Sequence, residues 1–464
     1  YYQLNHSNSI VKGINKKLTH RTVKQFLKGL GIKDKKIIYV DHHYSHACSA
    51  FFSSGFKESL VITADARGDA LSMTVSIGDQ EGLKRISSSP VGASMGNLYG
   101  AVTEALGFEY ASGEGKTEAL AAFGVNTNLY DKLKTFIQVD GLKFNGFIAP
   151  YHRRISVPIS RIIKGYRREN IAFAIQNLLE EIFCELVANA IAETGIKNIA
   201  LAGGIFFNVK LNHKIMDLPD VKDIHIFPAA GDNGISSGAA FAAYHSEIGE
   251  IENKRWNHVY LGTEYSNEEI EAVLKKKNIS FEKMDDIAGY AGEEILPDGN
   301  IIGWYQGRME YGPRALGHRT VLISPQEKKY HQKILDTIKK RPPFQPFCPS
   351  MIQEAEKVYL ENPKNIANPF MIITFYAHER MRKEAPVGVF IDGSVRVQTV
   401  NKEFEPKYHR AIEAFGNETG TPILINTSFN RSGEAIVENP DQAITDLYLG
   451  RLDYLVIGDY LVKR

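Results

Sequence analysis

Residues 41–46 read Asp41-His42-His43-Tyr44-Ser45-His46, and they end an apolar run over residues 37–40. If this segment is helical, the four-residue spacing of His42 and His46 puts both imidazoles on one face. Two neutral imidazoles on one face bind a metal ion when carboxylates from elsewhere complete its shell. We therefore expect a metal site here. Asp65 and Asp232, each close to the end of a predicted strand, are the candidate carboxylates.

Other interpretations of the histidine pair stay open on spacing alone. Two helix-capping histidines with a structural role are the main alternative. The pair does not match the zinc-protease motif, because no Glu follows the first His. We expect His43 to point off the shared face, and so not to bind the ion.

The composition is typical of an ordinary globular protein with two or three domains. The chain has 464 residues, of which 43% are hydrophobic and 23% charged, and its formal net charge is +1. This balance argues against a broad nucleic-acid-binding surface, so we expect no nucleic-acid partner. The three cysteines form no CxxC pair, which favours a reducing compartment and a cytoplasmic protein. No run of about 18 apolar residues occurs, so we expect no membrane partner.

A hairpin and a long helix organise the first part of the chain. Residues 59–65 are predicted to form a buried strand, and the Gly68-Asp69 turn leads into a returning strand over residues 70–77. Residues 169–194 have the strongest helical periodicity in the chain, and Gly195 is a plausible end for that helix. The pattern predicts an α/β fold.

Two glycine loops follow short predicted strands. Residues 199–202 run into Gly203-Gly204, and residues 224–227 run into the loop that contains Gly231-Asp232. Loops of this kind leave backbone N–H groups free at helix starts, which suits phosphate. Together with an Asp-bearing hairpin, they favour a nucleotide-binding fold.

A rise in charge and polarity over residues 246–282 marks the expected domain boundary. We predict a first domain over residues 1–255, a linker over residues 256–280 and a second domain over residues 281–464. The chain starts at Tyr1 without an initiator Met, so we expect that upstream residues are missing.

Basic and polar loops indicate an anion site in the second domain. Residues 307–320 contain three arginines and three glycines, and Lys339-Lys340-Arg341 follows further on. Arginine recognises phosphate or carboxylate through paired hydrogen bonds, although a solvated basic face is the alternative. The segment 425–430 supplies side chains that suit a ligand's polar edge or, equally, a turn.

Taken together, these strings resemble the O-carbamoyltransferase family of nodulation-factor and antibiotic tailoring enzymes. The resemblance runs from about residue 37 to 462 and is most specific in six segments. These are 42–47, 201–204 with Asn208, 231–234, 311–319, 392–398 and 426–430.

The resemblance implies a fold and a set of ligands for the first domain. It implies an actin/Hsp70/sugar-kinase-like first domain and a YrdC-like α/β second domain. Fe(II), or a similar divalent metal, would be held by His42, His46, Asp65 and Asp232. The nucleotide would rest on Gly203, Gly204, Asn208, Gly231 and Asp232.

The resemblance also implies a two-step reaction. Carbamoyl phosphate and ATP, with Mg(II), would form carbamoyl-adenylate in the second domain, and the carbamoyl group would then pass to a hydroxyl of a small-molecule acceptor. The catalytic residues implied are His42, His46, Lys116, Arg314 and Arg319, with Glu118 near the nucleotide or acceptor. Carbamoyl phosphate and the adenylate would contact Arg314, Arg319, Lys339, Arg341, Asn426, Ser428 and Asn430.

One departure and two rivals accompany this interpretation. Family members usually carry an upstream strand and glycine-rich loop with a His-Asp pair, and no segment here matches it. A tRNA threonylcarbamoylation enzyme is the nearest rival, disfavoured by the near-neutral charge. A non-catalytic nucleotide-binding regulator on the same scaffold is the second. The acceptor, the metal's identity and a homodimer are left open.

Overall fold

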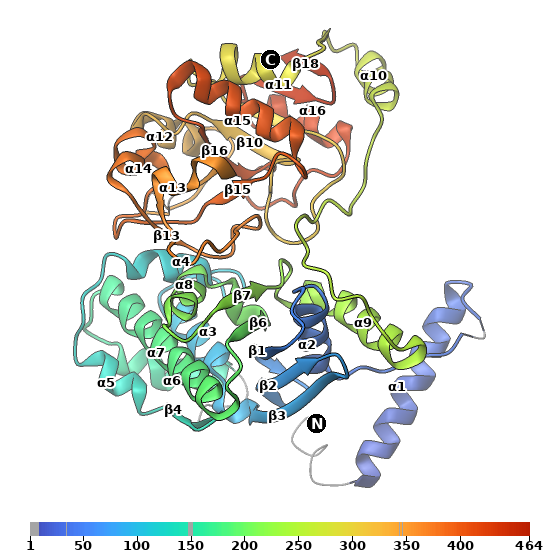
Figure 1. Ribbon diagram of the computed structural model, residues 1–464, viewed down its shortest axis with the longest axis vertical. Helices are drawn as coiled ribbons and strands as arrows, with labels where there is room; N and C mark the ends of the chain where they lie inside the picture. Colours follow the sequence, from blue (N-terminus) through green and yellow to red (C-terminus); the bar gives the residue numbers. More distant parts are fainter. Residues whose placement is uncertain (1–8, 34, 147–151, 343, 346) are drawn as a thin grey trace.

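The protein is described by a computed structural model that covers residues 9–464 except 34, 147–151, 343 and 346. Figure 1 shows two lobes, one above the other in that view, with the chain passing between them after α9 (Ile235–Ile248). The first lobe contains a five-stranded mixed sheet and the second an eight-stranded mixed sheet, each covered by helices. The predicted α/β class is confirmed.

The first-lobe sheet has the strand order β3-β2-β1-β6-β7. β1 (Ser59–Gly68), β2 (Leu71–Asp79) and β3 (Gly82–Pro90) form an antiparallel meander, as the hairpin signal predicts. β6 (Asn198–Ala202) and β7 (Asp223–Ile226) extend the sheet in parallel with β1. The carboxyl ends of these three parallel strands therefore meet at one edge, where ligands bind in open α/β sheets.

Helices cover both faces of this sheet because its strands are buried on both sides. Val61 of β1 belongs to a core with α2 (His42–Phe52) and α9, whereas Leu60 and Ile62 point to the other core. That other core contains α3 (Met95–Ala105) and α7 (Arg168–Thr194). α7 ends at Gly195, which adopts the left-handed conformation, so the long predicted helix is confirmed within one residue.

Smaller elements complete the first lobe. They are α1 (Ser9–Gly29), η1 (Val91–Ala93), α4 (Glu114–Ala121), α5 (Leu129–Lys134), β4 (Ile137–Asp140), β5 (Lys143–Gly146), α6 (His152–Ile162), η2 (Gly204–Phe207), α8 (Val209–Asp217) and η3 (Asp232–Gly234). β4 and β5 form a separate two-stranded sheet. α1 projects from the body of the lobe (Figure 1).

The main sheet of the second lobe has the order β15-β11-β16-β10-β9-β17-β18-β8. Its strands are β8 (Glu282–Lys283), β9 (Ile302–Tyr305), β10 (Arg319–Ile323), β11 (Cys348–Ile352), β15 (Gln398–Val400), β16 (Ile423–Ser428), β17 (Tyr454–Ile457) and β18 (Tyr460–Lys463). β9 and β10 are antiparallel, and β10 pairs antiparallel with β16. The ends of β9 and β16 and the start of β10 therefore lie side by side.

Two helical layers enclose this sheet. One core contains α11 (Ile287–Tyr290), η4 (Ala291–Ile295) and α15 (Pro406–Thr419). The other contains α10 (Asn267–Lys276), α12 (Lys328–Asp336) and α16 (Pro440–Leu449). The remaining elements are η5 (Gln353–Ala355), α13 (Glu356–Tyr359), β12 (Leu360–Glu361), β13 (Phe375–Ala377), α14 (Glu379–Glu384), η6 (Pro386–Gly388) and β14 (Ser394–Val395).

The stretch 256–280, expected to be a linker, contains a helix of the second lobe. α10 starts at a capping box in which Ser266 and Glu269 bond each other's backbone. Its Ile270 and Leu274 are buried in the second-lobe core. The polarity that suggested a linker belongs to the solvent-exposed face of this amphipathic helix.

The two lobes share a continuous core and several polar contacts. β12, β13 and β14 form a small sheet in the segment of the second lobe that packs against α8. Asn212 Nδ2 donates to the Ile372 carbonyl at 2.7 Å, and His213 Nδ1 lies 2.8 Å from the Thr374 carbonyl. Lys364 Nζ donates to three carbonyls at the end of α8 and just after it, at 2.6–2.7 Å. The lobes therefore meet in a defined interface.

Within the described part of the chain, the helices are all too short or too polar to cross a membrane.

Candidate metal and anion sites

Local hydrogen bonds fix where helix α2 begins. Asp41 is its N-cap and accepts a hydrogen bond from Tyr44 N at 2.8 Å. Asp69, in the turn between β1 and β2, accepts from His42 N at 2.8 Å. Arg85 of β3 holds Asp41 at 2.6 Å. The first turn of α2 is thus tied to the sheet, with His42 at its start.

Two histidines and two aspartates converge beside this helix start. His46 Nε2 lies 3.4 Å from Asp65 Oδ2 and 3.6 Å from Asp232 Oδ1. His42 Nε2 lies 3.5 Å from Asp232 Oδ1 and 3.9 Å from Asp65 Oδ2. One ligand atom from each residue falls within 4.8 Å of the others, and among the described residues this is the only such group. The structure therefore brings together all four residues predicted as metal ligands.

The donor set and its spacing fit a divalent cation. Ligand atoms about 2.0–2.1 Å from one ion in a tetrahedral shell are about 3.3 Å apart, close to the separations here. Both ring nitrogens of His46 and Nε2 of His42 are buried and have no hydrogen-bond partner among the described residues. Such orphaned nitrogens are costly unless a ligand satisfies them. Two imidazoles with two carboxylates suit iron or a neighbouring first-row metal.

The electrostatics of the cluster also fit a cation site. Burial lowers the pKa of His46, but the Asp232 and Asp65 carboxylates outweigh burial and hold this pKa above its usual value. Burial raises the pKa of Asp65, but the neighbouring imidazoles of His42 and His46 outweigh it, so this pKa is well below its usual value. The group thus concentrates negative charge against imidazole, as a cation site requires.

His43 faces away from the cluster, as its place on the helix predicts. Its Nδ1 lies 2.8 Å from Thr63 Oγ1, which in turn lies 2.7 Å from Thr74 Oγ1. Burial, together with His42 and His46, lowers the pKa of His43 to about 4, so the ring is neutral. His43 fastens α2 to β1 and β2.

The glycine loops let the chain approach the cluster closely. Gly203 has φ of +106°, and a Cβ there would lie 2.1 Å from the Ala64 carbonyl oxygen. Gly204 N donates to Asp65 Oδ2 at 3.2 Å. A Cβ on Gly231 would lie 2.8 Å from the Phe207 ring. These predicted nucleotide-binding glycines thus border the cation cluster.

Asn208 has a structural task as well as its predicted nucleotide role. Its side-chain oxygen caps α8 by accepting from Leu211 N at 2.9 Å, and its amide nitrogen donates to Gln176 at 2.8 Å. Gln176 in turn donates to Glu180 at 2.7 Å. Both polar atoms of Asn208 are therefore engaged within the first lobe, and its nucleotide role stays a prediction.

In the second lobe, Arg314 lies in an arginine cluster near the first lobe. Burial and the neighbouring Arg396 lower the pKa of Arg314 to about 9. Burial also lowers the pKa of Arg341, although Cys348 opposes this shift. Arg396 Nε donates to Cys348 Sγ at 2.8 Å. Several guanidinium groups held close together in a half-buried place favour an anionic ligand.

Lys339, Ser428 and Asn430 lie together at the end of β16. The side chain of Lys339 is buried, and its Nζ donates to Ser428 Oγ at 3.0 Å and to Asn430 Oδ1 at 2.5 Å. Burial and Arg341 lower the pKa of Lys339 to about 7. Arg341 also donates to Thr427 Oγ1 at 3.0 Å. Four residues predicted to contact carbamoyl phosphate or the adenylate thus share one corner of the lobe.

Two residues of the predicted anion set point elsewhere. Arg319 is fully buried, its guanidinium donates to the carbonyls of Gln306 and Gly307 at 2.6 and 3.0 Å, and it stacks 3.7 Å from the Tyr305 ring centroid. Asn426 is also buried, and its amide donates within the second-lobe core. These donors are therefore engaged within the second lobe, and a contact of either side chain with the anion stays a prediction.

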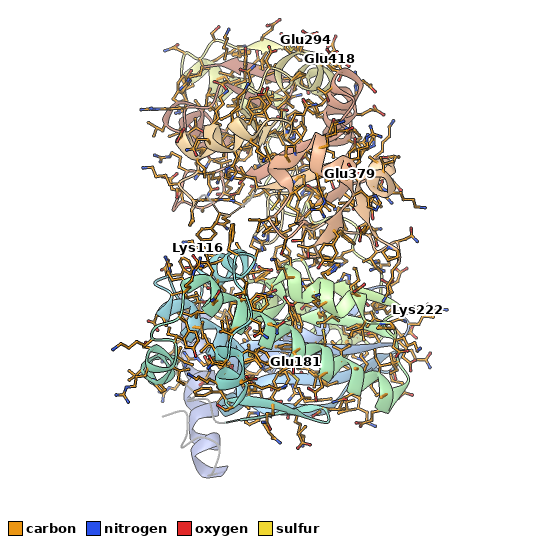
Figure 2. The ribbon with its side chains drawn as sticks, turned by 90° about the vertical axis from the view of Figure 1, so that its left-hand side faces the viewer. Lys116, Glu181, Lys222, Glu294, Glu379 and Glu418 are labelled. Atoms are coloured by element: carbon orange, nitrogen blue, oxygen red, sulfur yellow. The ribbon has the colours of Figure 1, made fainter. Side chains whose placement is uncertain are left out.

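Lys116 and Glu118 project from α4 of the first lobe. Figure 2 places Lys116 at the edge of the first lobe that faces the second, and its Nζ lies 5.9 Å from the Phe108 ring centroid. Glu118 is buried and accepts from Lys210 N at 3.0 Å. Burial raises the pKa of Glu118, while the charges of Lys210, Arg396 and Arg314 oppose the shift. Glu118 therefore connects the first lobe to the arginine cluster of the second.

The junction between the lobes, where Glu118 faces the arginine cluster, includes two residues that the sequence did not indicate. Arg396 lies in the segment 392–398, which the sequence marks only as part of the family resemblance, with no role for Arg396. Lys210 Nζ pairs with Asp392 Oδ2 at 2.5 Å across the lobes. A cation in a Gly-Ser loop and a lysine next to a helix cap were the signals available, but neither indicates a partner on another lobe.

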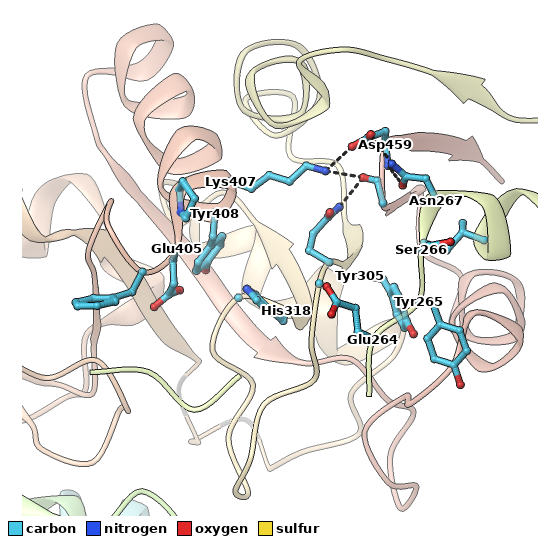
Figure 3. A pocket seen from close by; sticks show the side chains of 17 residues that line it. Glu264, Tyr265, Ser266, Asn267, Tyr305, His318, Glu405, Lys407, Tyr408 and Asp459 are labelled. Atoms are coloured by element: carbon cyan, nitrogen blue, oxygen red, sulfur yellow. Dashed lines mark hydrogen bonds and ion pairs between the residues drawn. The ribbon is translucent and has the colours of Figure 1, made fainter. Parts of the chain in front are cut away.

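Two cavities lie outside the cation cluster. One, of about 280 Å³, is lined by both lobes, with Gln176 and Lys210 on one side and Asp392 and Ser394 on the other. The other, of about 420 Å³, lies within the second lobe (Figure 3). Its wall includes His318 and Glu405, close to the chain segment that carries Arg314.

Comparison with known proteins identifies related chains. The family model "Carbamoyltransferase N-terminus" matches residues 5–241, and "Carbamoyltransferase C-terminus" matches residues 293–464. An uncharacterized protein of Methanocaldococcus jannaschii is 36% identical over 97% of this chain and 77% of its own length. Nodulation protein NolNO of Sinorhizobium fredii is 34% identical over 94% of this chain and 65% of its own length. The 3'-hydroxymethylcephem-O-carbamoyltransferase of Streptomyces clavuligerus is 25% identical over 75% of this chain and 64% of its own length.

Proposed function

The chain belongs to the carbamoyltransferase family and is a transferase, and from this premise we propose that it works in two steps on its two lobes. The second lobe, which we assign to the YrdC-like type, forms carbamoyl-adenylate from carbamoyl phosphate and ATP. The first, of the actin/Hsp70/sugar-kinase type, passes the carbamoyl group to a hydroxyl of a small molecule. Names of relatives that include an O-carbamoyltransferase support a hydroxyl acceptor.

The first step needs a site that neutralises and aligns phosphates. Water hydrolyses carbamoyl phosphate to carbamate and phosphate; a carbamate oxygen then attacks the α-phosphorus of ATP, and the bond to pyrophosphate breaks. Arg314, Arg396 and Arg341, each half-buried, offer positive charge to these groups. Lys339, near Ser428 and Asn430, adds a cation that is partly charged near pH 7.

The second step takes place, in this proposal, at the cation cluster of the first lobe. A divalent metal bound there by His42, His46, Asp65 and Asp232 would act as a Lewis acid toward the carbonyl or a phosphate oxygen. The chain's own contribution is the close approach of the Gly203–Gly204 loop, which offers its backbone to AMP beside Asp65. The acceptor oxygen attacks the carbamoyl carbon, the bond to AMP breaks, and the hydroxyl proton is lost.

Hand-over between the lobes follows from their contact. Acyl-adenylates hydrolyse, so an enclosed path that excludes water preserves the intermediate. Buried Glu118 and the Lys210–Asp392 pair lie at the junction between the arginine cluster and the first lobe. We propose that these residues keep the two lobes aligned while the carbamoyl-adenylate passes between them.

The observation that carries the proposal is the convergence of His42, His46, Asp65 and Asp232 in a chain that also has a half-buried arginine cluster. The test is carbamoyl-phosphate-dependent release of pyrophosphate from ATP. Arg314→Ala is expected to lower this rate by roughly 10²–10³-fold, the usual loss when one group that stabilises charge is removed. Arg308→Ala is the matched control, because Arg308 is exposed in the same segment. Pyrophosphate release at the same rate with and without carbamoyl phosphate would refute the proposal.

A further inference from the structure

The chain segment 310–319, which carries Arg314, is held by a buried carboxylate. Glu310 is 6% exposed. One of its oxygens accepts hydrogen bonds from Leu316 N at 2.7 Å, His318 N at 2.9 Å and Arg319 N at 3.1 Å. Three backbone donors on one carboxylate oxygen fix the path of the segment after Arg314.

Donors from three other parts of the lobe hold the carbonyl groups of the same segment. Asn426 Nδ2 donates to the Ala315 carbonyl at 3.1 Å. Gln398 Nε2 and Tyr260 Oη both donate to the Leu316 carbonyl at 2.8 Å. We call Glu310, Tyr260, Gln398 and Asn426 the loop clamp. Both faces of the peptide chain beside Arg314 are therefore bonded to buried side chains.

The clamp residues also orient one another. Gln398 Oε1 accepts from Ser350 Oγ at 2.8 Å and from Asn426 Nδ2 at 3.1 Å, so its Nε2 must face the Leu316 carbonyl. The ring of Tyr260 stacks on His318 at 3.7 Å between centroids. Figure 3 shows His318 and Glu405 lining the same pocket, and Gln398 Nε2 also lies 3.2 Å from Glu405. These contacts hold the side chains of the clamp in defined orientations.

Arg314 itself is not fixed by its own hydrogen bonds. Its Nε is buried and has no hydrogen-bond partner in the described part of the chain. The backbone around it adopts conformations that favour glycine, with φ of +113° at Gly312 and +105° at Gly317. The main chain therefore decides where the guanidinium lies, and the clamp decides where the main chain lies.

We propose that the loop clamp residues are positioning residues that aim Arg314 at the anion in the second lobe. This inference rests on the proposed function for the identity of the anion. In this proposal Asn426 supports the site through the backbone of the segment. Glu310, Gln398 and Tyr260 have the same positioning role, and none of the four contacts the anion.

A double-mutant cycle on the whole chain tests this proposal. The probe is inorganic pyrophosphate, titrated calorimetrically into wild type, Tyr260→Phe, Asn426→Asp, Arg314→Ala and the two double variants. Tyr260→Phe removes one hydroxyl and keeps the ring on His318, so it is the mild variant. Tyr265→Phe is the matched control, since Tyr265 lines the nearby cavity and has no bond to the segment among the described contacts.

We expect Tyr260→Phe and Asn426→Asp each to weaken pyrophosphate binding roughly 10-fold in the wild-type background. In the Arg314→Ala background they should weaken it no further, because their effect passes through Arg314. Equal weakening in both backgrounds, or wild-type affinity in Tyr260→Phe, would overturn the proposal. A chain that gives the expected cycle but releases no pyrophosphate from ATP would refute the proposed function and leave the clamp standing.

Discussion

His46 is the residue on which the proposed metal site depends most. Its ring is fully buried, and neither nitrogen has a hydrogen-bond partner among the described residues. Its Nε2 lies within 3.6 Å of a carboxylate oxygen from each aspartate. A cation that binds all four side chains would satisfy these groups at once.

Replacing His46 by Ala should therefore remove the bound metal. We expect affinity for Fe(II) to fall at least about 100-fold, more than is typical for loss of a group that only supports a ligand. The measurement is metal content per chain after anaerobic loading and desalting. His378→Ala, at a half-buried histidine of the second lobe, is the control and should retain the metal. Equal metal content in both variants would contradict the ligand assignment.

Lys339 gives the anion site a pH dependence. Burial and Arg341 lower the pKa of Lys339 to about 7 in the folded chain. The side chain is thus charged below pH 7 and loses its charge as the pH rises through that value. Sulfate affinity, measured with an anion that does not itself titrate here, should fall between pH 6 and 8.

Lys339→Arg is the companion variant for this pH measurement. A guanidinium keeps its charge over the whole range, so this part of the pH dependence should disappear. Sulfate affinity that is flat from pH 6 to 8 in the wild-type chain would show that Lys339 does not contribute its charge.

At the residue scale, the sequence predicts ligands better than it predicts supporting groups. Helical spacing indicates His42 and His46, and the ends of strands indicate Asp65. Arg314 and Arg319 look equivalent in the sequence, yet β10 turns Arg319 into the core, where carbonyl groups take its donors. The burial of a side chain depends on strand pairing, which a local pattern does not show.

At the scale of elements, the contact between α2 and α9 sets the position of the histidines. The two helices lie so close that a Cβ on Gly238 would be 1.7 Å from the Ser45 carbonyl oxygen. α2 is tied to the sheet on its other side through His43 and Thr63. Small residues at this crossing therefore allow the histidine face to reach Asp65.

Gly238→Ala should separate these helices. We expect a loss of about 1–3 kcal/mol in stability, typical of overpacking, together with weaker metal binding. Thermal unfolding followed by circular dichroism and the metal content measure the two effects. Gly115→Ala is the matched control, because Gly115 lies in helix α4 and has no atom within 4 Å of an added Cβ. An unchanged melting temperature for Gly238→Ala would contradict the packing account.

Periodicity predicts the longest elements well and short amphipathic ones poorly. The apolar repeat over residues 169–194 and the hairpin after residue 59 correspond to α7 and to β1 and β2. α10 was missed because charged residues dominate it and only Ile270 and Leu274 enter the core. Two buried side chains in ten residues are too weak a signal to oppose the expectation of a linker.

At the scale of the whole molecule, we expect the junction between the lobes to control the coupling of the two proposed steps. The Lys210–Asp392 pair and Glu118 join parts of the chain that lie far apart in sequence. Lys210 has 11% side-chain exposure and Asp392 32%, so the pair is partly shielded from solvent. Its loss should matter more for transfer than for formation of the adenylate.

Lys210→Ala should therefore uncouple the reaction. We expect pyrophosphate release to stay near wild type while the carbamoylated product per pyrophosphate falls several-fold, because the intermediate escapes to water. The ratio of the two products is the measurement. Lys197→Ala, which breaks an exposed ion pair of the same lobe, is the control. A proportional loss of both products would contradict a role in hand-over.

Above all, we propose that the chain makes carbamoyl-adenylate and then transfers its carbamoyl group to an acceptor. The most direct measurement is mass spectrometry of a quenched reaction containing the chain, ATP and ¹³C-labelled carbamoyl phosphate, without an acceptor. We predict labelled AMP that carries one carbamoyl group, and none with Arg314→Ala. Consumption of ATP with no label on AMP would contradict the account.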